Sequence, residues 1–277
     1  MKLHDFLIEE DIKSALKEDI GFGDITTDAL VADDAVLSGN LNSRSEGILC
    51  GCSVFEKVFK ILCNDIKIKF YFKDGDFIAC GDKIADISGN ARCILTGERT
   101  ALNYIQRLSG IATETKKYQD AIGDYPTKIV DTRKTTPNFR IFEKYAVKTG
   151  GGALHRFNLS DCAMIKDNHI RLAGSIGNAV DKLKENLSHA HKIEVECDTL
   201  QQVKEALNCD VDIIMLDNMT ISDMKSACDL INGRAIVEAS GNVTLQTIKE
   251  IASTGVDIIS SSAIVSKAPT LDLALDI

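Results

Sequence analysis

The chain has 277 residues, of which 44% are hydrophobic and 26% charged, and its net charge at pH 7 is -9. This length allows one large barrel or two ordinary domains, each with a substantial hydrophobic core. No apolar run approaches the roughly 20 residues of a membrane helix, and the acidic balance disfavours nucleic acid as a partner. We therefore expect a cytoplasmic globular protein that binds neither membrane nor nucleic acid.

The nine cysteines give no sign of a metal or disulfide framework. Their number is odd, no CxxC pair occurs, and most have apolar neighbours, so we expect reduced thiols. Cys50 and Cys52 lie close in sequence, but two ligands do not fill a tetrahedral zinc site.

The first part of the chain predicts a small α+β domain. Residues 1–20 have apolar residues at helical spacing, and residues 35–90 alternate like strands, with a helix predicted at 54–62. A long helix is expected over 94–122, with a break near Ser109 and Gly110.

After Tyr125 the pattern changes to alternating short apolar runs and amphipathic segments, which is typical of βα units around a parallel sheet. We expect domains at 1–110 and 111–277, with the C-terminal segment able to return to the first domain. The expected strands are 128–130, 163–165, 192–195, 211–216, 235–237 and 256–259, and the expected helices are 140–148, 173–187, 200–207, 221–231 and 245–252.

Polar residues follow each expected strand, as in Asp131 to Lys134, Lys166 to His169, and the segment from Ser260 to Ser262. The carboxyl ends of parallel strands meet on one face, which is where α/β barrels carry their active sites. A doubly wound sheet usually brings a Gly-rich dinucleotide loop, and neither GxGxxG nor GxxxxGK[ST] occurs here. We therefore expect an incomplete α/β barrel of the TIM-like type.

Basic residues are concentrated in one stretch of this acidic chain. Residues 128–171 contain nine Lys or Arg and four Asp or Glu, a net charge of +5. Crowded like charges repel unless a bound anion neutralises them, so this stretch predicts a polyanion site. Arg133, Lys134, Arg156 and Lys166 are suited to carboxylates and phosphates, and Ser240-Gly241-Asn242 before a helix is suited to a phosphate.

These segments resemble the quinolinate phosphoribosyltransferase family, also called carboxylating nicotinate-nucleotide pyrophosphorylases. The resemblance covers most of the chain and implies an α/β sandwich domain, an incomplete barrel and a homodimer in which one subunit closes its neighbour's site. The motifs that carry it, in order, are EDIGFGDITT from Glu18, GERTALN from Gly97, SGIAT from Ser109, DTRKTTP from Asp131, EKYAVKTGGG from Glu143, HR at His155, IKDNH from Ile165, EVE from Glu194, MLDN from Met215 and EASGN from Glu238.

The family reaction joins quinolinate to phosphoribosyl pyrophosphate in the presence of Mg2+ and gives nicotinate mononucleotide, pyrophosphate and CO2. By resemblance, Lys134, Glu196 and Asp217 are catalytic, and the last two contact the Mg2+ pyrophosphate and ribose. Carried over in the same way, the substrate contacts are Arg99 from the partner subunit, Thr132, Arg133, Lys134, His155, Arg156, Lys166, Glu196, Asp217, Ser240, Gly241, Asn242, Ser261, Ser262 and Ala263. Two positions depart from the family pattern: Ser262 replaces the usual Gly, and Leu154 replaces a frequent Asn.

Three alternatives remain at this stage. A related phosphoribosyltransferase acting on nicotinate or another acid is a close competitor, although Arg133, His155, Arg156 and Lys166 favour a dicarboxylate substrate. A Schiff-base aldolase or decarboxylase would use Lys134 or Lys166 as its nucleophile. A non-enzymatic carrier domain is suggested by the strand texture of residues 74–87, although no Met-Lys-Met-type attachment turn accompanies it.

Overall fold

The computed structural model describes all 277 residues, and their contacts divide them into two compact units. The first unit comprises Met1–Lys116, Thr136–Gly151 and Ala268–Ile277, and the second comprises Lys117–Thr135 and Gly152–Lys267. The boundary expected at residue 110 follows chain order, whereas each unit gathers stretches that are distant in sequence. The return of the C-terminal segment to the first unit appears directly in the strand pairing.

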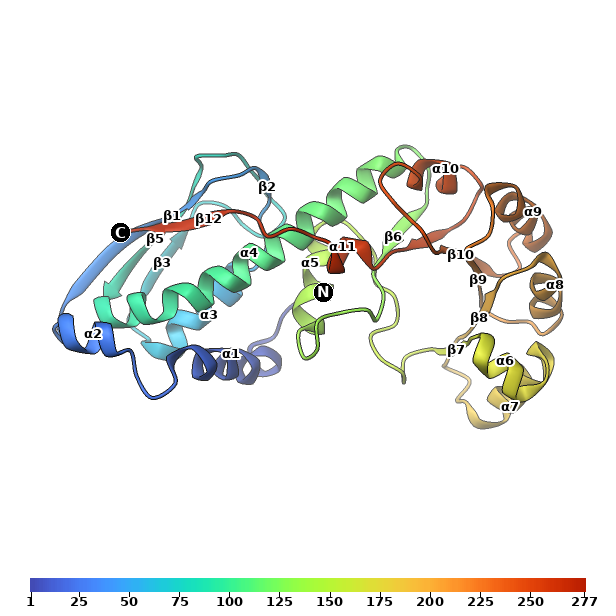
Figure 1. The fold of residues 1–277 in the computed structure, drawn as a ribbon, viewed down its shortest axis with the longest axis horizontal. Coiled ribbons are helices and arrows are strands. Elements are labelled where there is room, and N and C mark those ends of the chain that lie inside the picture. Colours follow the sequence, from blue (N-terminus) through green and yellow to red (C-terminus); the bar gives the residue numbers. More distant parts are fainter. The chain divides into compact units, whose positions relative to one another are not determined.

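The first unit is built on a four-stranded antiparallel sheet in the order β12-β1-β5-β3 (Figure 1). The last strand, β12, pairs with β1, which brings residues near the end of the chain into this sheet. The elements of this unit are α1 (Asp5–Ile20), α2 (Ile25–Leu30), β1 (Val36–Ser43), β2 (Gly47–Ile48), α3 (Cys52–Leu62), β3 (Lys67–Phe70), β4 (Phe77–Ile78), β5 (Lys83–Asn90), most of α4 (Ala91–Ile122), α5 (Arg140–Thr149) and β12 (Leu273–Asp276).

Helix α4 is continuous over Ala91–Ile122, so the expected break near Ser109 and Gly110 is wrong. Gly110 does not break the helix. It allows the backbone at Pro269 to approach the helix closely. A Cβ atom on this residue would lie 1.9 Å from the carbonyl oxygen of Pro269, so only glycine fits there. The helix tolerates this glycine because its other residues pack along its length, with Ile105, Leu108 and Ile111 fully buried.

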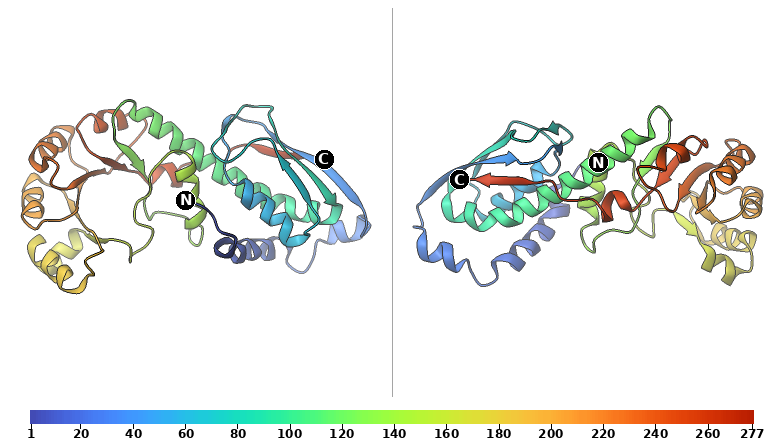
Figure 2. Two further views of the ribbon diagram at one scale, coloured as in Figure 1. Left: turned by 180° about the vertical axis from the view of Figure 1, so that it is seen from behind. Right: turned by 45° about the horizontal axis from the view of Figure 1, so that its top comes forward.

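The second unit contains a six-stranded parallel sheet in the order β6-β11-β10-β9-β8-β7. The end strands β6 and β7 are not paired with each other, so the sheet is an open barrel, as expected. Figure 2 shows this sheet curving, with the helices on its outer side. The strands are β6 (Lys128–Val130), β7 (Ala163–Ile165), β8 (Ile193–Cys197), β9 (Ile213–Asp217), β10 (Ile236–Ser240) and β11 (Ile258–Ser260).

The helices of the second unit follow the expected alternation, with two additional short helices, Asp167–Ala173 and Ala263–Ser266. The helix expected at 173–187 is Ile176–Asn186, and the additional helix before it ends because Gly174 adopts a left-handed φ of 90° and Ser175 caps the next helix. The helices are α6 (Asp167–Ala173), α7 (Ile176–Asn186), α8 (Leu200–Asn208), α9 (Ile221–Ile231), α10 (Ile248–Ala252) and α11 (Ala263–Ser266). No helix in the structure has the length and apolar character needed to span a bilayer.

Candidate active site

A cavity of about 700 Å³ lies at the carboxyl ends of the parallel strands. Its walls contain every substrate-contact residue expected from the sequence except one. Arg99 lies on the exposed surface of α4 in the first unit and does not line this cavity. The expected residues that do line it are Thr132, Arg133, Lys134, His155, Arg156, Lys166, Glu196, Asp217, Ser240, Gly241, Asn242, Ser261, Ser262 and Ala263.

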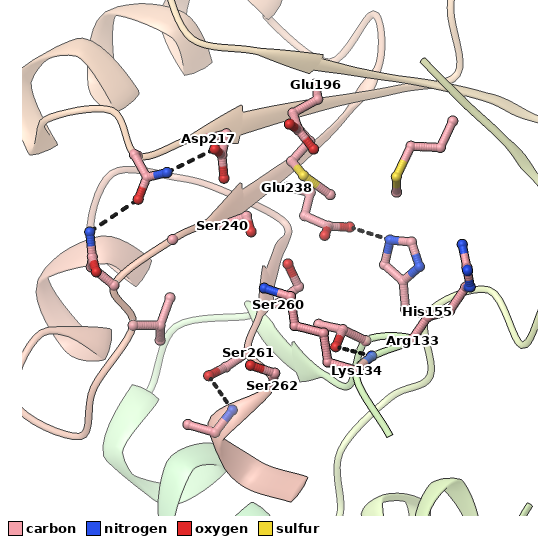
Figure 3. A pocket seen from close by; sticks show the side chains of 18 of the residues that line it. Arg133, Lys134, His155, Glu196, Asp217, Glu238, Ser240, Ser260, Ser261 and Ser262 are labelled. Atoms are coloured by element: carbon pink, nitrogen blue, oxygen red, sulfur yellow. Dashed lines mark hydrogen bonds and ion pairs between the residues drawn. The ribbon is translucent and has the colours of Figure 1, made fainter. Parts of the chain in front are cut away.

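The side chains reach the cavity from several strands (Figure 3). Glu196, Asp217 and Glu238 project from strands β8, β9 and β10, while His155 comes from the loop before β7. Since carboxylates and cations meet in one space, the cavity is suited to ligands that carry both negative charge and hydroxyl groups.

The turn after β6 places two cations at the cavity wall. Thr132 Oγ1 accepts a hydrogen bond from the Lys134 backbone N–H at 3.0 Å, which fixes the turn containing Arg133. The buried Asp131 accepts the His155 backbone N–H at 2.9 Å. This contact ties the two basic segments together although 24 residues separate them in sequence.

Arg156 is held by its own loop and strand. Its Nη1 donates to the Cys162 carbonyl at 2.8 Å, and its Nη2 lies 3.6 Å from the Met164 sulfur. The guanidinium is thus oriented from one side and still lines the cavity. Such a fixed planar cation is well suited to a carboxylate of the ligand.

His155 lies between two buried carboxylates that had no assigned role at the sequence level. Its Nε2 is 3.3 Å from an oxygen of Glu194 and 3.3 Å from an oxygen of Glu238. Burial alone lowers the pKa of His155, but hydrogen bonds and charge from the two glutamates outweigh burial and raise this pKa to about 10. Burial and the charge of Glu238 raise the pKa of Glu194, while the His155 contact lowers it.

A sequence signal for these glutamates was present. Glu194 stands two residues before Glu196, and Glu238 stands two residues before Ser240. In a strand, residues two apart point to the same face, so both glutamates had to face the same side as the expected site residues.

Lys166 pairs with Glu196 in a short contact between the ends of neighbouring strands β7 and β8. The Lys166 backbone N–H donates to His169 Nδ1 at 3.0 Å, so His169 caps the start of α6. The structure therefore joins one cation and one carboxylate that were expected to face different substrates.

At the opposite corner of the cavity, hydrogen bonds join three side chains. Asn218 Nδ2 donates to Asp217 at 2.8 Å, and Asn242 Nδ2 donates to Asn218 Oδ1 at 3.1 Å. Gly241 lies between these groups with a φ of 94°, and a Cβ atom on it would lie 2.1 Å from Asn218 Oδ1. Only glycine fits this close approach.

The departure at Ser262 is accommodated by ordinary backbone geometry. Its φ is -74°, so no left-handed conformation requires glycine at this position. Ser261 Oγ accepts the Ala263 backbone N–H at 3.2 Å, which shapes the turn into α11. Leu154, the other departure, is exposed and does not line the cavity.

The sequence reading missed several cavity residues. Among them Lys267, which follows α11, adds a cation to the serine-lined end. The others follow from neighbouring positions on strands or loops that already carried expected residues. The cavity residues without an expected substrate contact are Met164, Met215, Asn218, Glu238, Val243, Ser260 and Lys267, although Asn218, Glu238 and Ser260 lie in polar strand-end segments that were expected to face the site.

The carboxylates Glu196 and Asp217 are the expected contacts of Mg2+. Their oxygen ligands suit this hard ion, which usually takes one or two carboxylates together with substrate oxygens and water. They form no three-ligand cluster, since the only such group is His155, Glu194 and Glu238. The donor set therefore fits an ion that a phosphorylated substrate brings with it.

An open α/β barrel whose strand ends present clustered cations beside carboxylates defines the class: an enzyme acting on polyanionic substrates. Known proteins make the family specific. The family model described as "Quinolinate phosphoribosyl transferase, C-terminal domain" matches residues 111–276, and the model of the corresponding N-terminal domain matches residues 24–109. The chain belongs to the quinolinate phosphoribosyltransferase family.

Individual relatives agree over nearly the whole length. A probable carboxylating nicotinate-nucleotide pyrophosphorylase of Synechocystis is 44% identical, covering 98% of this chain and 92% of its own. The corresponding protein of Bacillus subtilis is 40% identical over 94% of this chain and 90% of its own. The crystal structure of NadC from Streptococcus pyogenes superposes with a TM-score of 0.97 at 41% identity, covering 100% of this chain and 98% of that one.

Proposed function

We propose that the cavity joins quinolinate to phosphoribosyl pyrophosphate with loss of CO2, giving nicotinate mononucleotide and pyrophosphate for NAD biosynthesis. Family membership supports this reaction. The structural observation that carries it is the gathering of Arg133, Arg156 and Lys166 with Glu196 and Asp217 around one cavity. A dicarboxylate and a pyrophosphate together require such a site, because their charges need neutralising before they can approach each other.

Quinolinate binds among the cations. Arg133 and Arg156 offer fork-shaped donors to its two carboxylates, and His155 and Lys166 complete the surrounding charge. As the resemblance to the family implies, Arg99 reaches this subsite from the partner subunit of a homodimer. In its own chain Arg99 is exposed on α4 and does not line the cavity.

The phosphoribosyl group binds at the carboxylate side. Glu196 and Asp217 contact the ribose hydroxyls, and Lys134 faces the phosphates. The same two carboxylates would hold Mg2+ together with the pyrophosphate, and the ion would there supply charge neutralisation for the leaving group. The turn of Ser240, Gly241 and Asn242 offers backbone N–H groups to the 5′-phosphate, together with Thr132 and the segment 261–263.

The chemistry needs orientation more than a strong acid or base. The ring nitrogen of quinolinate attacks the anomeric carbon while pyrophosphate leaves, so the residues contribute by positioning both reactants and by stabilising the leaving charge. The pyridinium nitrogen formed in this way then withdraws electrons from the adjacent carbon, which favours loss of its carboxylate as CO2. The resulting ring carbanion takes up a proton.

A Schiff-base mechanism fits the geometry less well. It needs a neutral lysine amine in an apolar pocket. Lys166 is paired with the Glu196 carboxylate, which is an arrangement for a charged ammonium, and Lys134 lies in an exposed turn beside Arg133. Treatment with borohydride and a carbonyl substrate is expected to leave both lysines unmodified, as mass spectrometry would detect.

Two variants test the division of roles. Arg133→Ala is expected to weaken quinolinate binding about tenfold or more with little change for phosphoribosyl pyrophosphate, since it removes a bidentate carboxylate contact. Asp217→Ala is expected to impair the phosphoribosyl side. Calorimetry with each substrate separately measures both effects, and identical profiles for the two variants would contradict the assignment.

A further inference from the structure

The cluster of His155, Glu194 and Glu238 is the most costly arrangement in the cavity. The side chains are 11%, 0% and 1% exposed, so all three ionisable groups are largely withdrawn from water. Glu194 and Glu238 come from strands β8 and β10, on either side of β9, and converge on the same imidazole nitrogen. Two carboxylates brought this close to each other repel, and both lose hydration.

The hydrogen bonds within the cluster offset only part of this repulsion and lost hydration. Glu238 Oε1 is buried and forms no hydrogen bond, and the buried Glu194 Oε2 has only its 3.3 Å ion-pair contact with His155 Nε2. Replacing a buried ionic cluster with apolar residues often costs nothing or even stabilises a protein, so structural stability alone does not account for two glutamates here. Their contact with a cavity-lining histidine points to a role in the site.

The other charged groups around His155 determine which proton state it adopts. Asp131 accepts its backbone N–H, and Arg133, Arg156, Lys166 and Glu196 line the same cavity. The cations oppose a further positive charge, whereas Glu194 and Glu238 are the carboxylates in direct contact with the ring. The balance favours the charged ring, and the pKa of His155 rises from 6.5 to about 10.

One contact favours the neutral ring. The Arg156 backbone N–H lies 2.8 Å from His155 Nδ1, where it donates to a nitrogen lone pair. A doubly protonated ring has no lone pair at Nδ1, so it loses this hydrogen bond and sets its own N–H against that of Arg156. Both glutamates share the single Nε2–H, but the attraction of two buried carboxylates for a positive ring outweighs the loss of one neutral hydrogen bond, so the charged ring still prevails.

We infer that Glu194 and Glu238 are positioning residues that hold the His155 imidazole charged and oriented, so that it remains a cation for the pyridine dicarboxylate. An ordinary histidine loses its charge near pH 6.5 and would be mostly neutral at cytoplasmic pH. The two glutamates therefore make quinolinate binding insensitive to pH across the neutral range. The inference rests on the proposed function, in which His155 contacts quinolinate.

The first test follows the His155 ring itself and needs no substrate. Nitrogen-15 NMR is recorded from pH 5 to 10.5 for the wild type, Glu194→Gln, Glu238→Gln and the double variant, with the His155 signal assigned from the spectrum of His155→Gln. We expect a charged ring beyond pH 9 in the wild type and loss of charge at or below pH 6.5 in the double variant. A wild-type ring that is neutral at pH 8 would overturn the inference.

The second test measures quinolinate affinity by calorimetry at pH 6 and pH 8. Wild-type affinity is expected to stay nearly constant. That of the double variant is expected to fall about tenfold or more between these pH values, because a histidine with an ordinary pKa is mostly neutral at pH 8. Glu250→Gln, on the exposed side of helix α10, is the matched control and should behave as the wild type.

The outcomes separate structure from positioning. If the glutamates only support the fold, the double variant loses affinity equally at both pH values while nitrogen-15 NMR shows its His155 ring still charged at pH 8, and the inference is wrong. Circular dichroism establishes that each isosteric variant is folded. If the wild type fails to bind quinolinate while its His155 ring stays charged beyond pH 9, the proposed substrate is wrong but the effect of the glutamates on the ring is not.

Discussion

The Lys166 ammonium pairs with the Glu196 carboxylate across the ends of strands β7 and β8. In the proposed function Lys166 serves quinolinate and Glu196 serves the phosphoribosyl group. In the structure without substrates, these two groups neutralise each other. Each substrate that binds must therefore compete with the ion pair, and removal of one partner should affect the two substrates in opposite directions.

Glu196→Gln is expected to leave quinolinate binding unchanged or tighter, because Lys166 no longer has a competing carboxylate. The same variant should lose turnover about a hundredfold or more, since a carboxylate at the reacting centre is removed. Calorimetry with quinolinate and steady-state kinetics measure the two effects. Lys166→Ala is the matched variant and should weaken quinolinate binding; a Glu196→Gln variant with equally weakened quinolinate binding would contradict the role of the pair.

Gly241→Ala should damage the phosphate turn through steric contact. A Cβ atom there would lie 2.1 Å from Asn218 Oδ1, which disrupts the hydrogen bonds joining Asp217, Asn218 and Asn242. We expect the KM for phosphoribosyl pyrophosphate to rise about tenfold or more, because the N–H groups that hold its phosphate move.

Gly255→Ala is the control for backbone strain. Gly255 has a φ of 95°, almost that of Gly241, but the nearest atom to a Cβ would be Cys228 Cβ at 3.8 Å. Both variants should lose about 1–2 kcal/mol of unfolding free energy from the left-handed conformation. If Gly255→Ala raises the KM for phosphoribosyl pyrophosphate as much as Gly241→Ala does, strain alone explains the effect and the phosphate turn is misassigned.

Much of the second unit could be predicted from the sequence. The apolar runs at 128–130 and 163–165 coincide with β6 and β7, because short buried strands in a parallel sheet are continuous apolar segments. The break expected in α4 was wrong, since glycine inside a helix signals either a break or a close approach. Only the tertiary contact of Gly110 with Pro269 distinguishes the two.

In the site, the sequence predicted which residues lie at the strand ends but not which of them contact each other. Strand-end positions revealed the cations and the carboxylates Glu196 and Asp217. The pairing of Lys166 with Glu196 and the convergence of Glu194 and Glu238 on His155 depend on how neighbouring strands are staggered. Stagger is a property of the assembled sheet, and the sequence of one strand does not contain it.

The stability of the protein should depend on the charge of His155. Its pKa is about 10 in the folded protein and 6.5 when unperturbed, so the stabilisation is fully present below pH 6.5 and is lost as the pH rises toward 10. We expect a loss of up to a few kcal/mol across this interval. Urea denaturation at pH 6.5, 8 and 9.5 should show a steeper decline for the wild type than for His155→Gln; equal slopes would contradict the raised pKa.

Subunit complementation tests whether Arg99 serves a neighbouring site. Arg99→Ala and Lys134→Ala should each be nearly inactive as homodimers. After co-refolding in equal amounts, half of the dimers are mixed and each has one intact site, so about a quarter of wild-type activity should return. No recovered activity, despite mixed dimers confirmed by native mass spectrometry, would show that Arg99 does not act across the interface.

Direct turnover tests the central claim. The purified protein is incubated with Mg2+, phosphoribosyl pyrophosphate and quinolinate labelled with carbon-14 in the carboxylate next to the ring nitrogen. We predict equal amounts of labelled CO2 and nicotinate mononucleotide, with no product when EDTA removes the ion. Product from nicotinate but none from quinolinate would contradict the proposed function.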